Sequence, residues 1–215
     1  MLSGLMRLAL DWRYVVENPV KRVKPFKESP PRIRYLTEAE AGRLLSACDS
    51  AWLRLIVQAT LLTAARKGEL RRLEWSEVDL ERGLITFLHT KNRSNRTIPL
   101  HGTLRNSLAS LPHREGPVFL GDDGLPVRKS ALRYAFEKAV KVADLAPFRF
   151  HDLRHAVVSF IVQAGVSLAV VQVIGGWKTV SMVNRYAHLQ PAHLRGAIDA
   201  LLALTCDVAG RSSSR

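Results

Sequence analysis

The chain has 215 residues, of which 32 are lysine or arginine and 19 are aspartate or glutamate, so its net charge is +13. Hydrophobic residues make up 47%, enough for the core of one large domain with short appendages. The charge favours a polyanionic partner, namely DNA, RNA or an acidic membrane surface. No apolar run approaches the ~20 residues of a membrane span. Leu2–Leu10 contains Arg7 and no small-residue cleavage site, which argues against a signal peptide.

The chain has only two cysteines, Cys48 and Cys206, which lie far apart in the sequence. Their separation matches no metal-ligand spacing, and one pair in a chain of this length argues against a disulfide framework. This usage is typical of a reducing cytoplasm. We therefore expect no zinc site and no structural disulfide.

The first 35 residues read as an appendage to the folded part. Apolar residues at helical spacing predict a short amphipathic helix over residues 1–16. Residues 17–35 contain four prolines among basic residues, which excludes a regular helix. This stretch is predicted to be a basic linker lying along a phosphate backbone, or equally a solvated tether. Its candidate DNA contacts are Lys21, Arg22 and Lys24.

From Leu36 onwards the pattern predicts a mainly α fold with a small antiparallel β-sheet (α+β). A capping box at Thr37–Glu40 opens a helix, and residues 51–65 are apolar nearly all round, which predicts a central helix. A shorter helix is expected between Gly68 and Trp75. β-like runs at 84–89 and 96–100 flank a polar turn at 92–95. Further helices are expected at 102–110, 128–143, 151–164, 167–174, 179–187 and 191–204, followed by a disordered tail at 205–215.

Two arginines are candidates for binding a phosphate. Cleaving a phosphodiester without a metal requires cations on two non-bridging oxygens, and the planar guanidinium is the best such group. Arg66 follows the apolar helix, with Glu69 placed to orient it; taken alone, a helix-end Arg66–Glu69 pair is the better reading. Arg154 and His151 are three residues apart in the first turn of a helix, where an arginine opposes the helix dipole unless an anion is bound. A surface pair without a ligand remains an alternative.

Three further positions could complete such a site. Lys91 lies at the predicted hairpin tip near Arg93 and Arg96, which are two further candidate DNA contacts. Lys91 could protonate a leaving 5′-oxygen, although a solvated turn lysine would look the same. Tyr186 has a phenol whose ordinary pKa of ~10 requires nearby cations before it can act as a nucleophile. Unaided, it would be interpreted as a core aromatic residue. Trp177 follows a Gly–Gly pair and could donate its indole N–H or simply pack.

Taken together, these segments over residues 36–204 resemble the catalytic domain of the tyrosine recombinase (phage integrase) family. The resemblance rests on Thr63-Ala-Ala-Arg-Lys-Gly-Glu-Leu70, on Lys91, on His151-Asp-Leu-Arg-His155, on Trp177 and on Arg185-Tyr-Ala-His-Leu189, all in the family's order. It implies that Tyr186 attacks the scissile phosphate to form a 3′-phosphotyrosine and release a 5′-hydroxyl. Arg66 and Arg154 would stabilise the transition state with help from His151 and Trp177, Lys91 would be the general acid, and Glu69 and His155 would support them.

The resemblance also implies partners and conditions. Neither ATP nor a metal is needed, because the covalent link conserves the bond energy. The partner would be double-stranded DNA, and the protein would be a cytoplasmic, nucleoid-associated product of a bacterium or phage. The helix at 191–204 would mediate self-association on DNA, or else pack in cis.

Three departures from the family pattern stand out. Ala64 replaces the usual glycine before the first arginine, and Gly175 replaces a leucine, which would loosen the segment carrying Trp177. Residues 1–16 match only the last helix of the family's core-binding domain, joined at Glu17-Asn-Pro19. The alternatives are a non-catalytic DNA-binding protein with a helix-turn-helix at 165–187 or an inactive integrase remnant. A metal-dependent nuclease is disfavoured because no carboxylates cluster.

Overall fold

The computed structural model describes residues 2–24, 36–88 and 95–189. The chain divides into two compact units, residues 1–32 and 33–215. In the smaller unit, α1 (Leu2–Asp11) is shorter than the predicted helix, because the chain turns at Arg13, whose φ is 62°. The short 3-10 helix η1 (Pro19–Arg22) follows, and the Asn18 side chain caps it by accepting from the backbone N of Val20 at 3.0 Å.

The larger unit is built around α3 (Ala51–Thr63), which packs against α2 (Glu38–Ser46), α5 (Gly102–Ala109), α6 (Lys129–Val142) and α7 (Phe150–Gln163). Seven of its residues are buried, so the predicted central helix is confirmed. The predicted capping box is also confirmed: Thr37 and Glu40 exchange side-chain-to-backbone hydrogen bonds of 2.9 and 3.2 Å at the start of α2.

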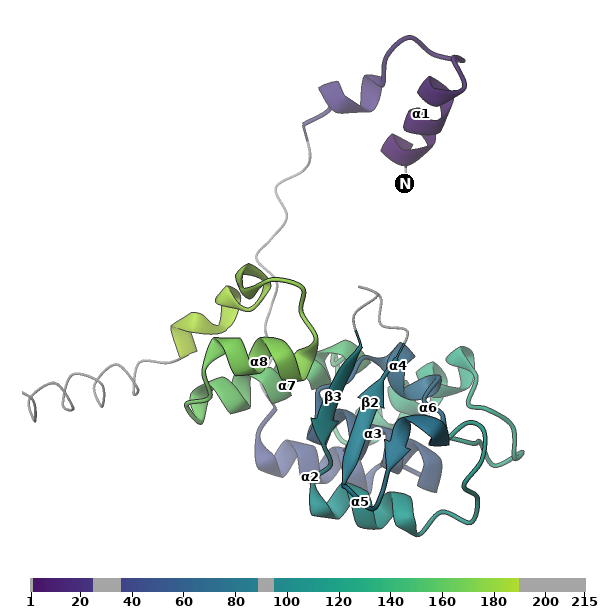
Figure 1. Cartoon of the computed structure of the whole chain (residues 1–215), viewed down its shortest axis with the longest axis vertical. Coiled ribbons are helices and arrows are strands. Elements are labelled where there is room, and N and C mark those ends of the chain that lie inside the picture. Colours follow the sequence, from purple (N-terminus) through teal and green to yellow (C-terminus); the bar gives the residue numbers. More distant parts are fainter. Residues whose placement is uncertain (1, 25–35, 89–94, 190–215) are drawn as a thin grey trace, which may run out of the picture. The chain divides into compact units, whose positions relative to one another are not determined.

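A three-stranded antiparallel sheet lies in the order β1-β2-β3 (Figure 1). β2 (Leu84–Phe87) pairs with β3 (Arg96–Pro99) in the register Phe87↔Arg96, and with the two-residue β1 (Val78–Asp79) on its other side. The sequence predicts β2 and β3, whereas β1 is too short to give an alternating pattern. α4 (Lys67–Arg71) and the 3-10 helix η2 (Trp75–Glu77) connect α3 to this sheet.

The last described segments form a second, smaller apolar cluster. α8 (Leu168–Gly175) lies beside α7 (Figure 1), and the short 3-10 helices η3 (Val180–Met182) and η4 (Asn184–Leu189) follow. The helix predicted over 179–187 is therefore not one continuous helix but two short 3-10 helices. The 3-10 geometry has three residues per turn, which places Val183 and Tyr186 on one side, where both are buried. A helix-turn-helix motif needs a second α-helix as its recognition element. The 3-10 helices after α8 do not provide one, so the structure argues against such a motif at 165–187. The predicted helix at 191–204 and the tail lie outside the described residues.

Candidate active site

Arg66 lies just beyond the end of α3. The helix stops because Ala64 adopts a left-handed conformation, φ 51° and ψ 23°, and the chain then re-enters a helix at Lys67. This turn directs the guanidinium towards the segment after α8. Its Nη2 donates to the carbonyl of Gly176 at 2.9 Å, and its Nη1 lies 2.6 Å from Oε1 of Glu69. The side chain keeps 23% of its exposure, so a ligand can reach it.

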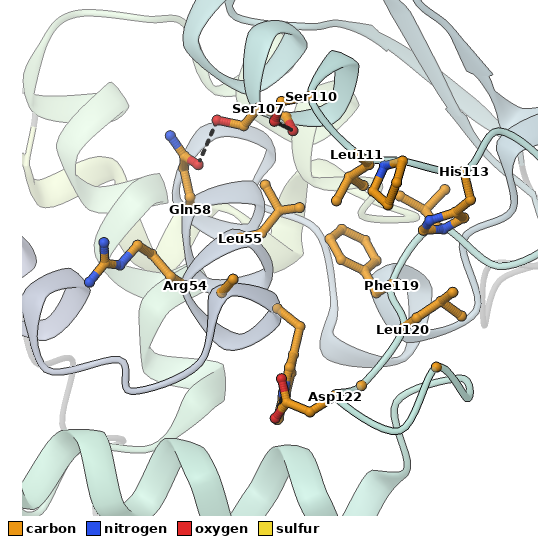
Figure 2. A pocket seen from close by; sticks show the side chains of 16 residues that line it. Arg54, Leu55, Gln58, Ser107, Ser110, Leu111, His113, Phe119, Leu120 and Asp122 are labelled. Carbon is orange, nitrogen blue, oxygen red and sulfur yellow. Dashed lines mark hydrogen bonds between the residues drawn. The ribbon is translucent and has the colours of Figure 1, made fainter.

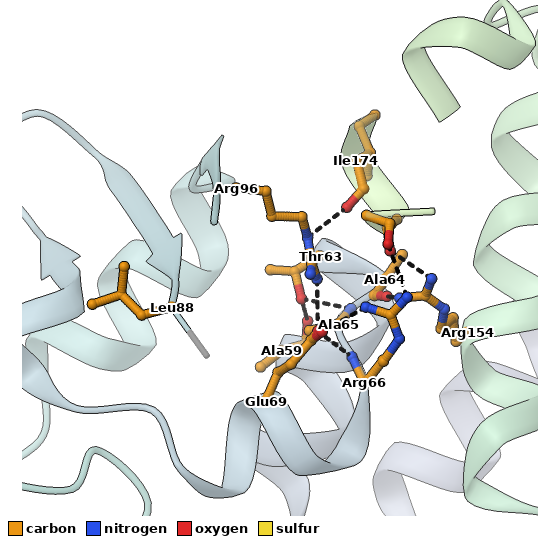
Figure 3. A network of polar contacts seen from close by, with 12 residues as sticks. Ala59, Thr63, Ala64, Ala65, Arg66, Glu69, Leu88, Arg96, Arg154 and Ile174 are labelled. Atoms are coloured by element: carbon orange, nitrogen blue, oxygen red, sulfur yellow. Dashed lines mark hydrogen bonds and ion pairs between the residues drawn. The ribbon is translucent and has the colours of Figure 1, made fainter. Parts of the chain in front are cut away.

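Glu69 is the buried anion of the site, with Oε2 2.8 Å from Nη2 of Arg96 and 2.9 Å from the backbone N of Arg66 (Figure 3). Burial raises the pKa of Glu69, but the hydrogen bond and charge of Arg96, followed by the contacts from Arg66, outweigh it and lower the pKa to about 2. The carboxylate is therefore ionised at any physiological pH.

Arg96 was expected among the DNA contacts, and the structure gives it a different place. Only 7% of the residue is exposed, its guanidinium stacks 4.4 Å from the centre of the Phe87 ring, and its Nε donates to the carbonyl of Ile174 at 3.0 Å. β3 alternates buried and exposed residues, and Arg96 falls on the buried side. The neighbouring Arg93 and the polar composition of residues 92–95 made Arg96 look like a surface residue in the sequence.

Arg154 is 2% exposed and binds two main-chain carbonyls. Its Nη1 donates to Ala64 at 2.7 Å and its Nη2 to Gly175 at 2.5 Å. The guanidinium also lies 4.0 Å from the ring centre of Trp177, within the range of a cation–π contact. Burial, and then the charges of Arg66 and Arg96, lower the pKa of Arg154, but a guanidinium remains protonated at neutral pH.

Gly175 makes room for the indole of Trp177. A Cβ at this position would lie 1.7 Å from a carbon of that ring. The expectation that Gly175 loosens the segment is wrong, because the tryptophan ring fills the space that a larger residue would take. Gly176, with φ 62°, ends α8 in the left-handed conformation that glycine adopts without strain.

Tyr186 is completely buried, and its hydroxyl is hydrogen-bonded to Nδ1 of His155. Its ring centre lies 6.4 Å from that of Trp177. Burial, and then the neighbouring His151, lower the pKa of His155 to about 4, so its imidazole is neutral near pH 7. His151 stacks edge-on to His155 at 4.7 Å; partial burial and then Arg154 lower its pKa too.

The structure thus gathers seven of the predicted residues at one place, where α3, α7 and the segment after α8 meet. They are Arg66, Glu69, His151, Arg154, His155, Trp177 and Tyr186. Lys91 and Arg93 lie outside the described residues. Lys21, Arg22 and Lys24 are exposed in the smaller unit, where Arg22 pairs with Glu17 at 2.6 Å. Sequence reasoning missed the carbonyls of residues 64, 174, 175 and 176, whose orientation depends on backbone turns.

Further features of the described ranges concern metal sites, membrane-spanning helices and cavities. Across residues 2–24, 36–88 and 95–189, no group of three or more His, Cys, Asp or Glu side chains could hold a metal ion. Nor does any helix in those ranges have the length and apolarity to cross a membrane. A cavity of about 550 Å³ is lined by residues such as Leu55 of α3, Ser107 of α5 and Phe119 (Figure 2), and contains none of the site residues.

The chain is similar in sequence to known proteins. A profile of the Phage integrase family matches residues 34–193. The chain is 34% identical to the integrase of Salmonella phage P22 over 213 residues, which cover 90% of this chain and 53% of that protein. It is 35% identical to a shufflon-specific DNA recombinase of Escherichia coli over 215 residues, covering 97% of this chain and 54% of that protein.

Solved structures agree. The catalytic domain of bacteriophage HP1 integrase superposes with a TM-score of 0.64 at 32% identity, covering 78% of this chain and 95% of that one. A lambda integrase dimer bound to a COC′ core site gives a TM-score of 0.69 at 23% identity, covering 86% and 56%. The chain belongs to the phage integrase family, and its larger unit has the fold of a tyrosine recombinase catalytic domain. The chain spans about half the length of the curated relatives it matches.

Proposed function

We propose that this chain supplies the catalytic domain of a site-specific DNA recombinase, which cuts and rejoins double-stranded DNA through a 3′-phosphotyrosyl intermediate. The observation that carries the proposal is the convergence of two guanidiniums on one turn. Arg66 donates to Gly176 and Arg154 donates to Gly175, the two residues that precede Trp177, and Tyr186 packs against the same indole.

In the proposed reaction, Oη of Tyr186 attacks the phosphorus and the bond to the 5′-oxygen breaks. Arg66 and Arg154 bind the non-bridging oxygens, where negative charge grows in the transition state. His151 and the indole N–H of Trp177 provide further hydrogen bonds. Lys91 gives a proton to the 5′-oxygen. The phenolic proton passes to Nδ1 of His155, the ring nitrogen that the hydroxyl already contacts.

A suicide substrate tests the proposal directly. A nicked duplex loses a short 5′-hydroxyl fragment after cleavage, so that the covalent protein–DNA adduct accumulates and is seen on a denaturing gel. We expect an adduct with the unchanged chain and none with Tyr186→Phe. Tyr134→Phe is the matched control, because Tyr134 is 74% exposed on α6 and far from the site in sequence; this variant should react normally.

The same assay distinguishes the recombinase proposal from the non-catalytic alternative. A DNA-binding protein without strand-transfer activity would shift the duplex on a native gel yet form no Tyr186-dependent adduct at saturating DNA and low salt. That outcome would remove the recombinase proposal.

We further propose that the protein self-associates on DNA through residues 191–204. The solved relatives include lambda integrase dimers and a tetramer on DNA, which supports assembly in this family. Light scattering of the chain on its duplex, with and without residues 190–215, measures the contribution of this segment. A complex of unchanged mass after the deletion would show that the segment is not needed for association.

A further inference from the structure

Arg96 is a buried arginine that the proposed reaction does not use. We propose that it is a positioning residue, which holds the Glu69 carboxylate and the turn after α8 so that Arg66 presents its guanidinium to the scissile phosphate. This inference rests on the proposed function. Figure 3 shows Arg96 and Arg66 on either side of the Glu69 carboxylate.

Two arginines share the one negative charge of Glu69. Glu69 receives Arg66 Nη1 on Oε1 at 2.6 Å and Arg96 Nη2 on Oε2 at 2.8 Å. Two cations therefore face one buried carboxylate, and the cluster keeps a net positive charge. Without Arg96, the carboxylate would be neutralised by Arg66 alone, and Arg66 would attract a phosphate less strongly.

Arg96 also contacts the segment that carries Trp177. Nε of Arg96 donates to the carbonyl of Ile174 at 3.0 Å, in the last turn of α8. A Cβ on Gly176 would lie 2.9 Å from Nη1 of Arg96, so the two residues are in close contact. Gly176 is also the residue whose carbonyl receives Arg66. Arg96 thus fixes both partners of Arg66.

This positioning role needs arginine in particular. One planar group reaches Glu69 and Ile174 in different directions while stacking on Phe87. A lysine offers a single point charge and cannot make this set of contacts. Moreover, Nη1 of Arg96 is buried and has no hydrogen-bond partner within the described ranges. An unpaired buried donor costs stability, so this arginine is better explained by placement of the site than by stabilisation of the fold.

The decisive experiment compares two substrates. Adduct formation is measured for the unchanged chain, Arg96→Met and Arg96→Lys, on suicide duplexes with a normal scissile phosphate or with an uncharged methylphosphonate. Misplacing Arg66 should slow cleavage of the normal phosphate roughly tenfold to a hundredfold in both variants. The deficit relative to the unchanged chain should shrink on the methylphosphonate, because less charge then has to be neutralised.

Arg105→Met is the matched control. Arg105 also donates to main-chain carbonyls, at Leu80 and Glu81, and its replacement removes the same charge, but it is exposed and does not contact Glu69. It should retain the rates of the unchanged chain on both substrates. Equal losses on both substrates for Arg96→Met, or full activity of Arg96→Lys, would overturn the inference.

A second measurement does not require cleavage of the DNA. Duplex affinity is determined for Arg66→Gln, for Arg96→Met and for the double variant. If Arg96 acts through Arg66, its substitution should cost little once Arg66 is gone, giving a non-additive cycle. Additive losses would refute the inference even if the chain formed no adduct. An absent adduct in the unchanged chain would instead remove the proposed reaction.

Discussion

Ala64 carries a backbone conformation that the site depends on. Its left-handed φ of 51° ends α3 and turns its own carbonyl towards Arg154. Such a conformation costs an L-residue roughly 1–2 kcal/mol relative to glycine. The chain therefore holds this turn at some cost, which the hydrogen bond from Arg154 and the burial of the methyl group offset.

Substitutions at Ala64 should therefore be asymmetric. Ala64→Gly removes both the backbone strain and a buried methyl group, so we expect a change in unfolding free energy within about 1 kcal/mol. Ala64→Val introduces a β-branched residue at positive φ in a site without space, and we expect a loss of at least about 2 kcal/mol. Urea unfolding measures both. Similar losses for the two variants would show that volume, not backbone conformation, governs the position.

His155 gives the fold a dependence on pH. Its pKa is about 4 in the folded protein against an ordinary 6.5, so the neutral form is favoured by folding. The sign follows: the contribution is complete above pH 6.5 and is lost as the pH falls towards 4. We expect His155→Gln to flatten the stability profile between pH 6.5 and 4, where one such group gives a slope of up to about 1.4 kcal/mol per pH unit. Thermal unfolding across this range tests it, and an unchanged slope would contradict it.

At the scale of elements, the turn after α8 is packed by one aromatic ring. Gly175→Ala would place a Cβ 1.7 Å from the Trp177 ring, so the indole would have to move and lose its contact with the Arg154 guanidinium. We expect a loss of roughly 1–3 kcal/mol in stability and slower cleavage. Adding Trp177→His, a smaller ring at the same place, should restore part of the stability. If the double variant is less stable than Gly175→Ala alone, the clash is not the cause.

The helices differ in how well they can be predicted from the sequence. The capping box at Thr37 and the apolar run of α3 are local patterns, and both can be predicted with their approximate bounds. The 3-10 segments at 180–189 cannot, because their geometry is set by burying Tyr186 against α7 rather than by local propensity. The order of the site residues is a local sequence pattern and can be predicted. The orientation of the main-chain carbonyls that hold the arginines depends on tertiary packing and cannot be predicted in this way.

For the whole molecule, the charge of +13 predicts DNA binding that weakens steeply with salt. The exposed Lys21, Arg22 and Lys24 are predicted to bind phosphates. Changing all three to glutamine should reduce the slope of log affinity against log salt by up to about 0.9 for each phosphate that is no longer neutralised. Arg22 is expected to contribute least because it already pairs with Glu17.

The control for this experiment keeps the net charge equal. Glutamine at Lys129, Arg133 and Lys141 removes three exposed charges from α6, which carries no site residue. This variant should change the slope less than the first one. Equal slopes for the two variants would show that the N-terminal residues act only through overall charge.

The acceptors that orient the two site arginines have a consequence for the variability of this active site. Arg66 and Arg154 are held by carbonyl oxygens of residues 64, 175 and 176, and every amino acid carries such an oxygen. Replacing a side chain there can strain the turn but cannot delete the acceptor. The guanidiniums of Arg66 and Arg154 can thus keep their orientation when the side chains at positions 64, 175 and 176 are changed.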